Sequence, residues 1–537
     1  MIAPSHGSAA ETKSPSMTAA MGAPDYDIET GLEREKKSYN EKEPYVDETG
    51  AVPGESFVYG NSLYARLQRL AAKFHVELRG IERVPEDERT DHSLMNVGTM
   101  WLAANMVVSS FTIGVLSVPL FELGFVDSIL TIFFINILGI LPVCFFSMFG
   151  PRFGLRQMVL SRFFFGWWGV KIIAFFNVLA CLGWSAVNVI VGAQLIHAVN
   201  HDVPGFAGII IIAVATFLVT LFGYKIVHIY EFWSWIPCFI VFLIVLGEFA
   251  HSGNFNNIHM QVGSSEAASV LSFACTVYGF ATGWTSYAAD YTVYHPPNQS
   301  RTKVFIWTFV GLAFPLLFTE FLGCAVATAT VSNAAYDAGY NDGGVGGLLA
   351  AVLVPPLGRF GKFCLVILAL SIIANNCPNI YSVGLTLQVL GRWTQRVPRF
   401  VWTLVGTIVY AAVAIPGYSH FAEYLQDFMN FIGYWLAIYQ GISLSEHFIF
   451  RRGFGGYNPE DYDKPNKLPY GFAAITAFAF GVFGAVMGMA QVWFVGPIGK
   501  KIGDPSIGGD VGFELAFAFS AITYIVLRYF ELKRFGR

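Results

Sequence analysis

The chain has 537 residues, of which 54% are hydrophobic, 16% aromatic and only 13% charged, with a formal net charge of -4. Its mean hydropathy of +0.52 lies outside the range of soluble globular domains. The composition excludes an ordinary soluble protein. It predicts an all-α integral membrane protein that crosses the bilayer many times and has no nucleic-acid partner.

Charged residues are concentrated in residues 1–95, ahead of almost continuous apolar sequence. We expect residues 1–57 to form a disordered cytoplasmic tail because of their polar composition. Residues 58–95 predict an amphipathic cytoplasmic helix and a linker, since Leu63, Leu67 and Leu70 recur at helical spacing. This helix either tethers the chain to the membrane face or takes part in gating the inner mouth.

The N-terminus lacks a basic stretch followed by an apolar core, so no signal peptide is expected and the first spanning helix should direct insertion. Lys36, Lys37 and Lys42 in the tail are candidate ubiquitin acceptors. Exposed tail lysines usually serve solubility alone, and that interpretation stays open.

Runs of about 20 apolar residues, enough to cross about 30 Å of hydrocarbon, predict twelve transmembrane helices. They are placed at 97–120, 126–149, 166–198, 206–224, 231–250, 267–289, 303–330, 362–391, 399–416, 423–446, 470–494 and 512–531. Residues 96–450 would form a ten-helix transport core. Residues 451–537 would supply the last two transmembrane helices and a short cytoplasmic C-terminus. The apolar segment 343–358 is broken by Gly and Pro, which favours a short external helix or a re-entrant piece.

The basic residues fix the expected topology. With a cytoplasmic N-terminus, the predicted cytoplasmic loops carry 13 Lys and Arg residues and the external loops carry 4. This distribution satisfies the positive-inside rule and predicts that both termini are cytoplasmic. The seven cysteines all lie in apolar runs without a CxxC spacing, so no disulfide framework, metal site or bound cofactor is expected.

The first and sixth spans carry small and polar residues at mid-membrane, in NMVVSSFTIG and VYGFATGWTSYAADY. Both stretches favour interrupted helices. An offset of five spans is typical of the five-plus-five inverted repeat of leucine-transporter-like folds, here with two extra helices. Small residues also let membrane helices simply pack closely, so this second interpretation stays open.

Two tryptophans are predicted near the bilayer midplane, Trp184 in the third span and Trp284 in the sixth. Asn188 lies one helical turn after Trp184. Indole rings can stack on a flat aromatic ligand while amides, which are both donors and acceptors, bind its edge. Each of these residues alone is also explained by ordinary helix packing.

The eighth span contains SIIANNCPNIYS, which places Asn375, Asn376 and Asn379 around Pro378 in an apolar run. An amide moved into hydrocarbon without partners costs about 4–8 kcal/mol. These side chains must therefore form hydrogen bonds with a polar ligand or with polar neighbours.

The motifs SSFTIG, GWSAVNVIVGAQ, GWTSYAADYTVYHP and ANNCPNIYS resemble those of the fungal purine-cytosine permeases, a branch of the nucleobase cation symporter family. The resemblance extends from about Tyr64 to Arg537. It implies twelve helices, of which the first ten form the inverted repeat. It also implies proton-coupled uptake of cytosine, adenine, guanine and hypoxanthine across the plasma membrane.

Carried over by position, the resemblance implies a set of substrate-binding residues: Ser110, Trp184, Asn188, Trp284, Asn375 and Asn376. The tryptophans would stack on the two faces of the base. Asn188 would bind its edge, and Asn376 would be the principal amide of the eighth span. Pro378 and Asn379 would have supporting, structural roles.

Ionisable residues within the membrane are candidates for proton coupling, because they are costly unless functional or paired. Glu320 in the seventh span is the deepest, and Asp290 ends the sixth. Glu320 could instead bond a neighbouring helix, and for Asp290 a salt bridge at an inner gate is favoured over proton carriage. Sodium coupling is less expected, since the stretch LALSIIANN of the eighth span offers one hydroxyl, that of Ser371.

Other functions are weighed against transport. A channel would need a charged ring or filter, and an enzyme would need a catalytic motif; the sequence shows neither. A receptor that senses nucleobases without moving them stays open. Within the family, uracil, allantoin, thiamine and nicotinamide riboside are competing substrates, and the three asparagines of the eighth span favour cytosine and purines. The oligomeric state is not indicated.

Overall fold

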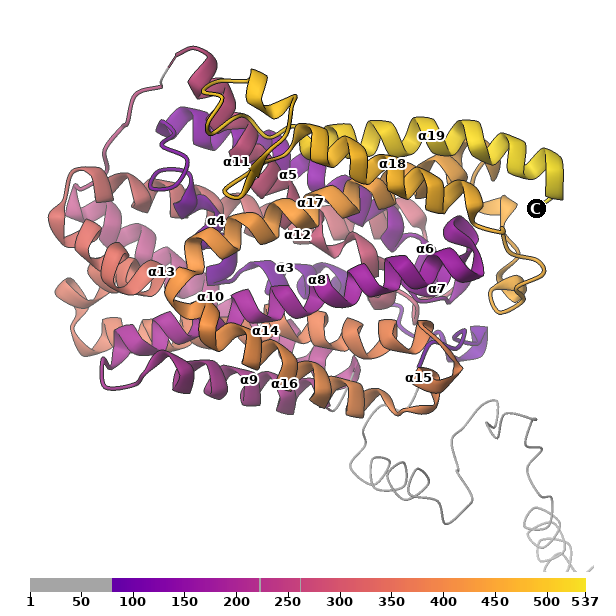
Figure 1. Ribbon diagram of the computed structural model, residues 1–537. Helices are drawn as coiled ribbons and strands as arrows, with labels where there is room; N and C mark the ends of the chain where they lie inside the picture. The colour runs from indigo at the N-terminus through magenta and orange to yellow at the C-terminus, as the bar shows by residue number, and fades with distance from the viewer. Residues whose placement is uncertain (1–79, 222–223, 261) are drawn as a thin grey trace, which may run out of the picture. The chain divides into compact units, whose positions relative to one another are not determined.

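The structure is a computed structural model that describes residues 80–221, 224–260 and 262–537 (Figure 1). The predicted tail of residues 1–57, its three candidate ubiquitin acceptors and most of the predicted amphipathic segment lie outside the described residues. Helices account for most of the described chain.

The first half of the described chain contains ten α-helices. They are α3 (Leu94–Asn105), α4 (Val108–Leu116), α5 (Phe125–Ser147), α6 (Phe149–Phe153), α7 (Gln157–Leu160), α8 (Arg162–Val199), α9 (Gly205–Leu221), α10 (Tyr224–Ser252), α11 (Ser264–Thr282) and α12 (Arg301–Ala327). The second half contains α13 (Ala334–Leu357), α14 (Arg359–Val389), α15 (Arg392–Arg396), α16 (Arg399–Gly417), α17 (Phe421–Ser445), α18 (Phe472–Gly488) and α19 (Gly512–Phe535).

Short elements join these helices. The 3₁₀ segments are η1 (Glu86–Glu88), η2 (Gly283–Tyr291), η3 (Thr328–Val331), η4 (Tyr418–His420), η6 (Phe454–Gly456), η7 (Pro459–Asp461) and η8 (Gly499–Lys501), and η5 (Glu446–Phe450) is a π-helix. Strands β1 (Ala490–Gln491) and β2 (Phe494–Val495) pair antiparallel between α18 and α19.

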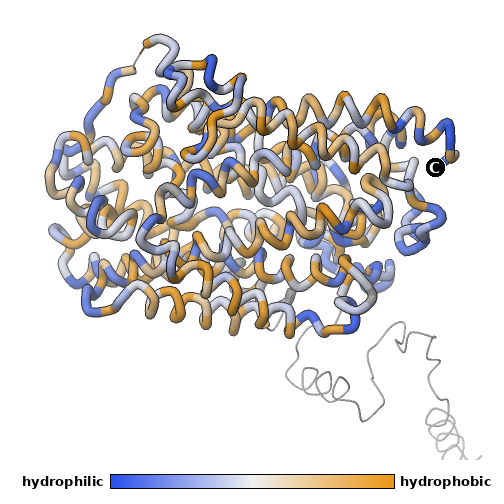
Figure 2. The backbone as a smooth tube through the Cα atoms, in the orientation of Figure 1, coloured by the Kyte–Doolittle hydropathy of each residue, from blue (hydrophilic) through white to orange (hydrophobic). Residues whose placement is uncertain are grey.

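Seven helices of the described chain are long and apolar enough to cross a bilayer: Phe125–Phe153, Arg162–Val199, Phe232–Ser252, Arg301–Val331, Arg359–Val389, Arg399–His420 and Gly512–Phe535. The bent pair α3 and α4 makes an eighth if it counts as one span. The shorter helices α9 and α18 are also apolar. Figure 2 shows hydrophobic residues along the helices, with hydrophilic residues gathered mainly at helix ends and loops.

Both predicted interruptions are present. The helix α3 ends at Asn105, the backbone becomes extended at Val107, and α4 begins at Val108 with a bend of 52° between the two axes. The helix α11 gives way at Gly283 to the 3₁₀ segment η2, which leaves helical geometry at Tyr287 (φ -144°). The helix α14, in contrast, continues through Pro378.

The interrupted helix is held against α12 by glycines. A Cβ at Gly114 of α4 would overlap the carbonyl oxygen of Glu320 of α12, and a Cβ at Gly323 of α12 would overlap that of Phe111. Small residues allow membrane helices to approach backbone to backbone, where dispersion contacts and weak Cα–H···O bonds add up. The helix α12 also contacts α3 and α5, so it braces the whole break.

The last two helices pack side by side along α17 (Figure 1). A buried ionic cluster fixes them at one end. Arg528 of α19 binds Glu446 through Nε (3.1 Å) and Nη2 (3.2 Å), and Tyr524 donates to the same carboxylate at 2.9 Å. Breaking such a buried pair by removing one partner costs about 3–5 kcal/mol. The cluster thus joins α19 to the end of α17.

The glycine contact gives a stability test. We expect Gly323→Ala to lower the free energy of unfolding by about 1–3 kcal/mol, because the added methyl group must displace backbone atoms. Gly247→Ala in α10 is the matched control, since a Cβ there meets no neighbouring atom. Thermal unfolding of both purified variants in detergent measures the effect, and equal midpoints would contradict it.

Candidate functional site

Side chains at the break between α3 and α4 form hydrogen bonds with the polar groups around it. The Asn105 amide donates from Nδ2 to the Trp101 carbonyl at 2.8 Å, and Ser110 Oγ donates to the Asn105 carbonyl at 2.7 Å. The Asn105 Oδ1 accepts from Nε1 of Trp284 at 3.1 Å. Asn105 therefore connects the first interrupted helix to the second.

A chain of hydrogen bonds runs from this break through two further helices. Ser109 Oγ donates to Oδ1 of Asn188 on α8 at 2.6 Å, and Asn188 Nδ2 donates to Oδ1 of Asn375 on α14 at 2.6 Å. Asn375 Nδ2 returns to the α3 carbonyl of Ala104 at 2.6 Å. All of these side chains are buried. The chain satisfies polar groups that would otherwise be costly in a membrane interior.

One face of α14 carries the amides that reach the site. Asn379 lies one turn after Asn375 and donates to its carbonyl at 3.0 Å, while Asn379 Oδ1 accepts from the Tyr287 hydroxyl at 2.7 Å. Asn376 is rotated by about 100° from Asn375 around the helix axis. Its amide is buried and makes no hydrogen bond among the described residues.

A small cavity of about 10 Å³ lies between α8, α14 and the second interrupted helix, formed by α11 and η2. It is lined by Trp184, Phe280, Gly283, Trp284, Tyr287, Asn375 and Asn379. The Trp184 ring packs edge-on against Phe280 at 5.2 Å, and Trp284 packs edge-on against Trp101 at 5.5 Å. A Cβ at Gly283 would come within 3.2 Å of the Trp184 indole nitrogen, so glycine there leaves room for that ring.

The structure brings most of the predicted site residues together, with two differences. Trp184, Trp284 and Asn375 line the cavity. Asn379, expected to be structural, also lines it, whereas Asn376 does not, because the helical phase of α14 turns only the first and fifth residues of the segment 375–379 toward the cavity.

Two more predicted residues lie just behind the cavity wall. Asn188 touches the site through Asn375, and Ser110 bonds the backbone of the break. Sequence reasoning missed Phe280 and Tyr287 as lining residues. The only available signal was their position within one turn of Trp284 along an interrupted helix.

Known proteins share both the sequence pattern and the fold of this chain. A family described as "Permease for cytosine/purines, uracil, thiamine, allantoin" matches residues 83–501. The chain belongs to this permease family. The permease is 65% identical over 489 residues to the purine-cytosine permease fcyB of Emericella nidulans, covering 91% of this chain and 95% of that protein. It is also 45% identical to the purine-cytosine permease FCY2 of Saccharomyces cerevisiae, covering 93% and 95%.

Among solved structures, the permease is similar to Mhp1, a nucleobase-cation-symport-1 family transporter, in a closed conformation with bromovinylhydantoin bound. The TM-score is 0.64 at 14% identity, and the match covers 86% of this chain and 96% of Mhp1. The inward-facing Mhp1 structure gives 0.63. The permease thus has the Mhp1 fold, and it is a membrane transporter rather than an enzyme.

The two candidate ionisable residues lie outside the cavity lining. Glu320 of α12 is fully buried, and its Oε2 accepts from Nδ2 of Asn136 on α5 at 2.7 Å. Asp290 ends η2, where its Oδ1 accepts from the backbone N–H of Gln157 at 2.7 Å. Arg156 donates to the backbone carbonyl of Asp290, also at 2.7 Å. Asp290 therefore joins η2 to the start of α7.

The hydrogen bonds of the asparagines predict that substitutions at two adjacent positions change the free energy of unfolding by different amounts. Asn375→Ala removes the partner of both Asn188 and the Ala104 carbonyl, so we expect the free energy of unfolding to fall by about 1 kcal/mol or more. Asn376→Ala removes an amide without a bonded partner among the described residues and should leave it unchanged or raise it. Thermal unfolding in detergent compares the two variants. A larger loss in Asn376→Ala would contradict the arrangement.

Proposed function

We propose that this permease is a proton-coupled symporter that takes up cytosine, adenine, guanine and hypoxanthine across the plasma membrane by alternating access. The observation that carries the proposal is the cavity lining, in which Trp184 and Trp284 stand with the amides of Asn375 and Asn379. Indole rings suit the faces of a flat heterocycle, and amides suit an edge that alternates donors and acceptors. The curated relatives named as purine-cytosine permeases support the same substrate class.

The number of spans, the inverted repeat and the side of the membrane on which the termini lie are also part of this proposal. Twelve spans result if α3 with α4, α11 with η2, α17 and the shorter helices α9 and α18 each cross once, in addition to the long apolar helices. The breaks after Asn105 and Thr282 would then open the two halves of a five-plus-five inverted repeat, with α18 and α19 appended. The excess of basic residues in alternate loops supports cytoplasmic termini.

Within the site, Asn375 and Asn379 would contact the base edge directly. Asn188 would hold the Asn375 amide in one orientation, because Nδ2 of Asn188 donates a hydrogen bond to Oδ1 of Asn375. Ser110 would keep the break in α3 and α4 closed at the carbonyl of Asn105. A direct role for Asn376 would require a conformation in which α14 or its neighbours have moved.

Glu320 is our candidate for the proton-binding group. Its side chain bonds α5 through Asn136, while its backbone packs against Gly114 of the interrupted helix. A change in its charge would therefore act on α4, which begins at the break beside the substrate cavity. Sodium coupling is less favoured, since the stretch LALSIIANN of α14 offers one hydroxyl, that of Ser371.

Uptake measurements test the function. Radiolabelled cytosine uptake is measured at pH 5 and pH 8 in a fungal host that lacks its own nucleobase carriers. We expect saturable uptake that is stronger at pH 5 and is blocked by adenine or hypoxanthine but not by uracil. Surface-expressed protein without uptake would overturn the substrate assignment, and uptake that is equal at both pH values would overturn proton coupling.

The same assay tests the coupling residue. Glu320→Gln fixes the side chain in a neutral form, so we expect cytosine accumulation to fall at least about tenfold while exchange of internal for external cytosine persists. Asp202→Asn, at an exposed loop position, is the control and should accumulate cytosine normally. Full pH-dependent accumulation by Glu320→Gln would assign the proton to another group.

A further inference from the structure

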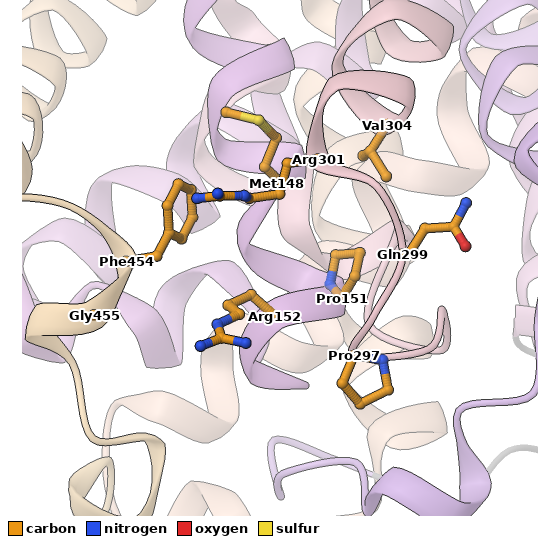
Figure 3. A pocket seen from close by; sticks show the side chains of 9 residues that line it. All are labelled: Met148, Pro151, Arg152, Pro297, Gln299, Arg301, Val304, Phe454 and Gly455. Carbon is orange, nitrogen blue, oxygen red and sulfur yellow. The ribbon is translucent and has the colours of Figure 1, made fainter. Parts of the chain in front are cut away.

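A second cavity, of about 310 Å³, lies away from the transport site (Figure 3). Its lining comes from three parts of the chain: Met148 and Arg152 around α6, Gln299 and Arg301 at the start of α12, and Phe454 of η6. It shares no lining residue with the cavity between the tryptophans. In the proposed topology, on which this inference depends, all three parts face the cytoplasm.

The cavity concentrates positive charge that the described part of the protein does not balance. Arg152 and Arg301 are both exposed, and neither forms an ion pair with a described carboxylate. The Arg301 guanidinium lies 4.8 Å over the Phe454 ring, which positions it without neutralising it. Among the described residues, no acidic side chain lines the cavity. Figure 3 shows the two arginine side chains extending toward the Phe454 segment.

An exposed apolar strip leads from the lipid-facing part of the protein to this cavity. On α5, Phe134, Leu138 and Leu141 are 62%, 46% and 40% exposed. Phe145 and Met148 follow them at helical spacing, so Met148 continues the strip into the cavity. On α12, which packs against α5, Trp307, Val310 and Phe314 are also exposed. In a membrane transporter these side chains contact acyl chains.

We propose that this cavity binds the phosphate headgroup of an anionic phospholipid of the cytoplasmic leaflet, with its acyl chains along the strip of α5 and α12. A guanidinium group binds a phosphate through two parallel N–H···O hydrogen bonds. Anionic lipids are enriched in the cytoplasmic leaflet. The apolar strip favours a lipid over a free phosphate ion, which would gain nothing from Met148 or Phe454.

The site is connected to the interrupted helix. Thr292, which follows η2, donates to the Ser147 carbonyl at the end of α5 at 2.8 Å. Gln299 and Arg301 belong to the connection that leads from η2 into α12. A headgroup held between Arg152 and Arg301 would therefore brace the segment that carries Trp284 at its other end.

Binding of soluble short-chain lipids tests the proposal on the purified full-length protein. We expect dihexanoyl phosphatidic acid to bind more tightly than dihexanoyl phosphatidylcholine in native mass spectrometry. Arg152→Gln with Arg301→Gln should weaken phosphatidic acid binding about tenfold or more. Arg396→Gln removes one exposed charge at another cytoplasmic position and should change the affinity less than about twofold. Equal binding by the double variant would overturn the proposal.

Two further experiments distinguish a bound lipid from other ligands of the cavity. Inorganic phosphate that displaces the lipid at the lipid's own concentration would indicate a free-phosphate site and overturn the lipid assignment. A photo-crosslinking amino acid at Gln299, with both arginines intact, should capture phospholipid in cells. Capture of residues 1–57 instead, which carry 11 acidic and 5 basic residues, would overturn the proposal in favour of the chain's own tail.

Discussion

Interrupting a helix inside a membrane frees backbone carbonyls that water cannot reach, and the arrangement of this site depends on how those carbonyls are satisfied. Asn375 of α14 reaches the Ala104 carbonyl, and Ser110 reaches that of Asn105. Because Asn375 is also bonded to Asn188, the positions of α8 and α14 are set by the same break. The Asn105 side chain extends the constraint to Trp284 on η2. The cavity lies where these requirements meet.

The interruptions themselves could be predicted from the sequence, because glycine, serine and threonine gather at mid-membrane only where helices break or pack closely. The break at Asn105 and the change of helix type at Gly283 are both present. The tryptophans could be predicted too, since Trp284 lies in such a stretch and Trp184 lies one helical turn before Asn188 in the third span. The family and its general fold followed from motifs that extend over most of the chain.

The orientation of α14 could not be predicted from its composition. Asn375, Asn376 and Asn379 are the same residue type within one and a half turns, and the packing of α14 against α8 and its other neighbours decides which face lines the cavity. The spacing of four residues between Asn375 and Asn379 was the available clue. Phe280 and Tyr287 had only their position within one turn of Trp284 as a signal, because aromatic residues make up 16% of the chain and their type alone says little.

The hydrogen bonds between the asparagines have a consequence for how tightly the carrier can hold its cargo. In this structure the Asn375 amide is occupied by Asn188 and Ala104, and Oδ1 of Asn379 by Tyr287. A substrate must replace some of these bonds or use the remaining N–H and lone pair of each amide, so the protein's own side chains compete with it for the same groups. Such competition limits affinity and lets the site close on itself after release, which favours turnover over retention.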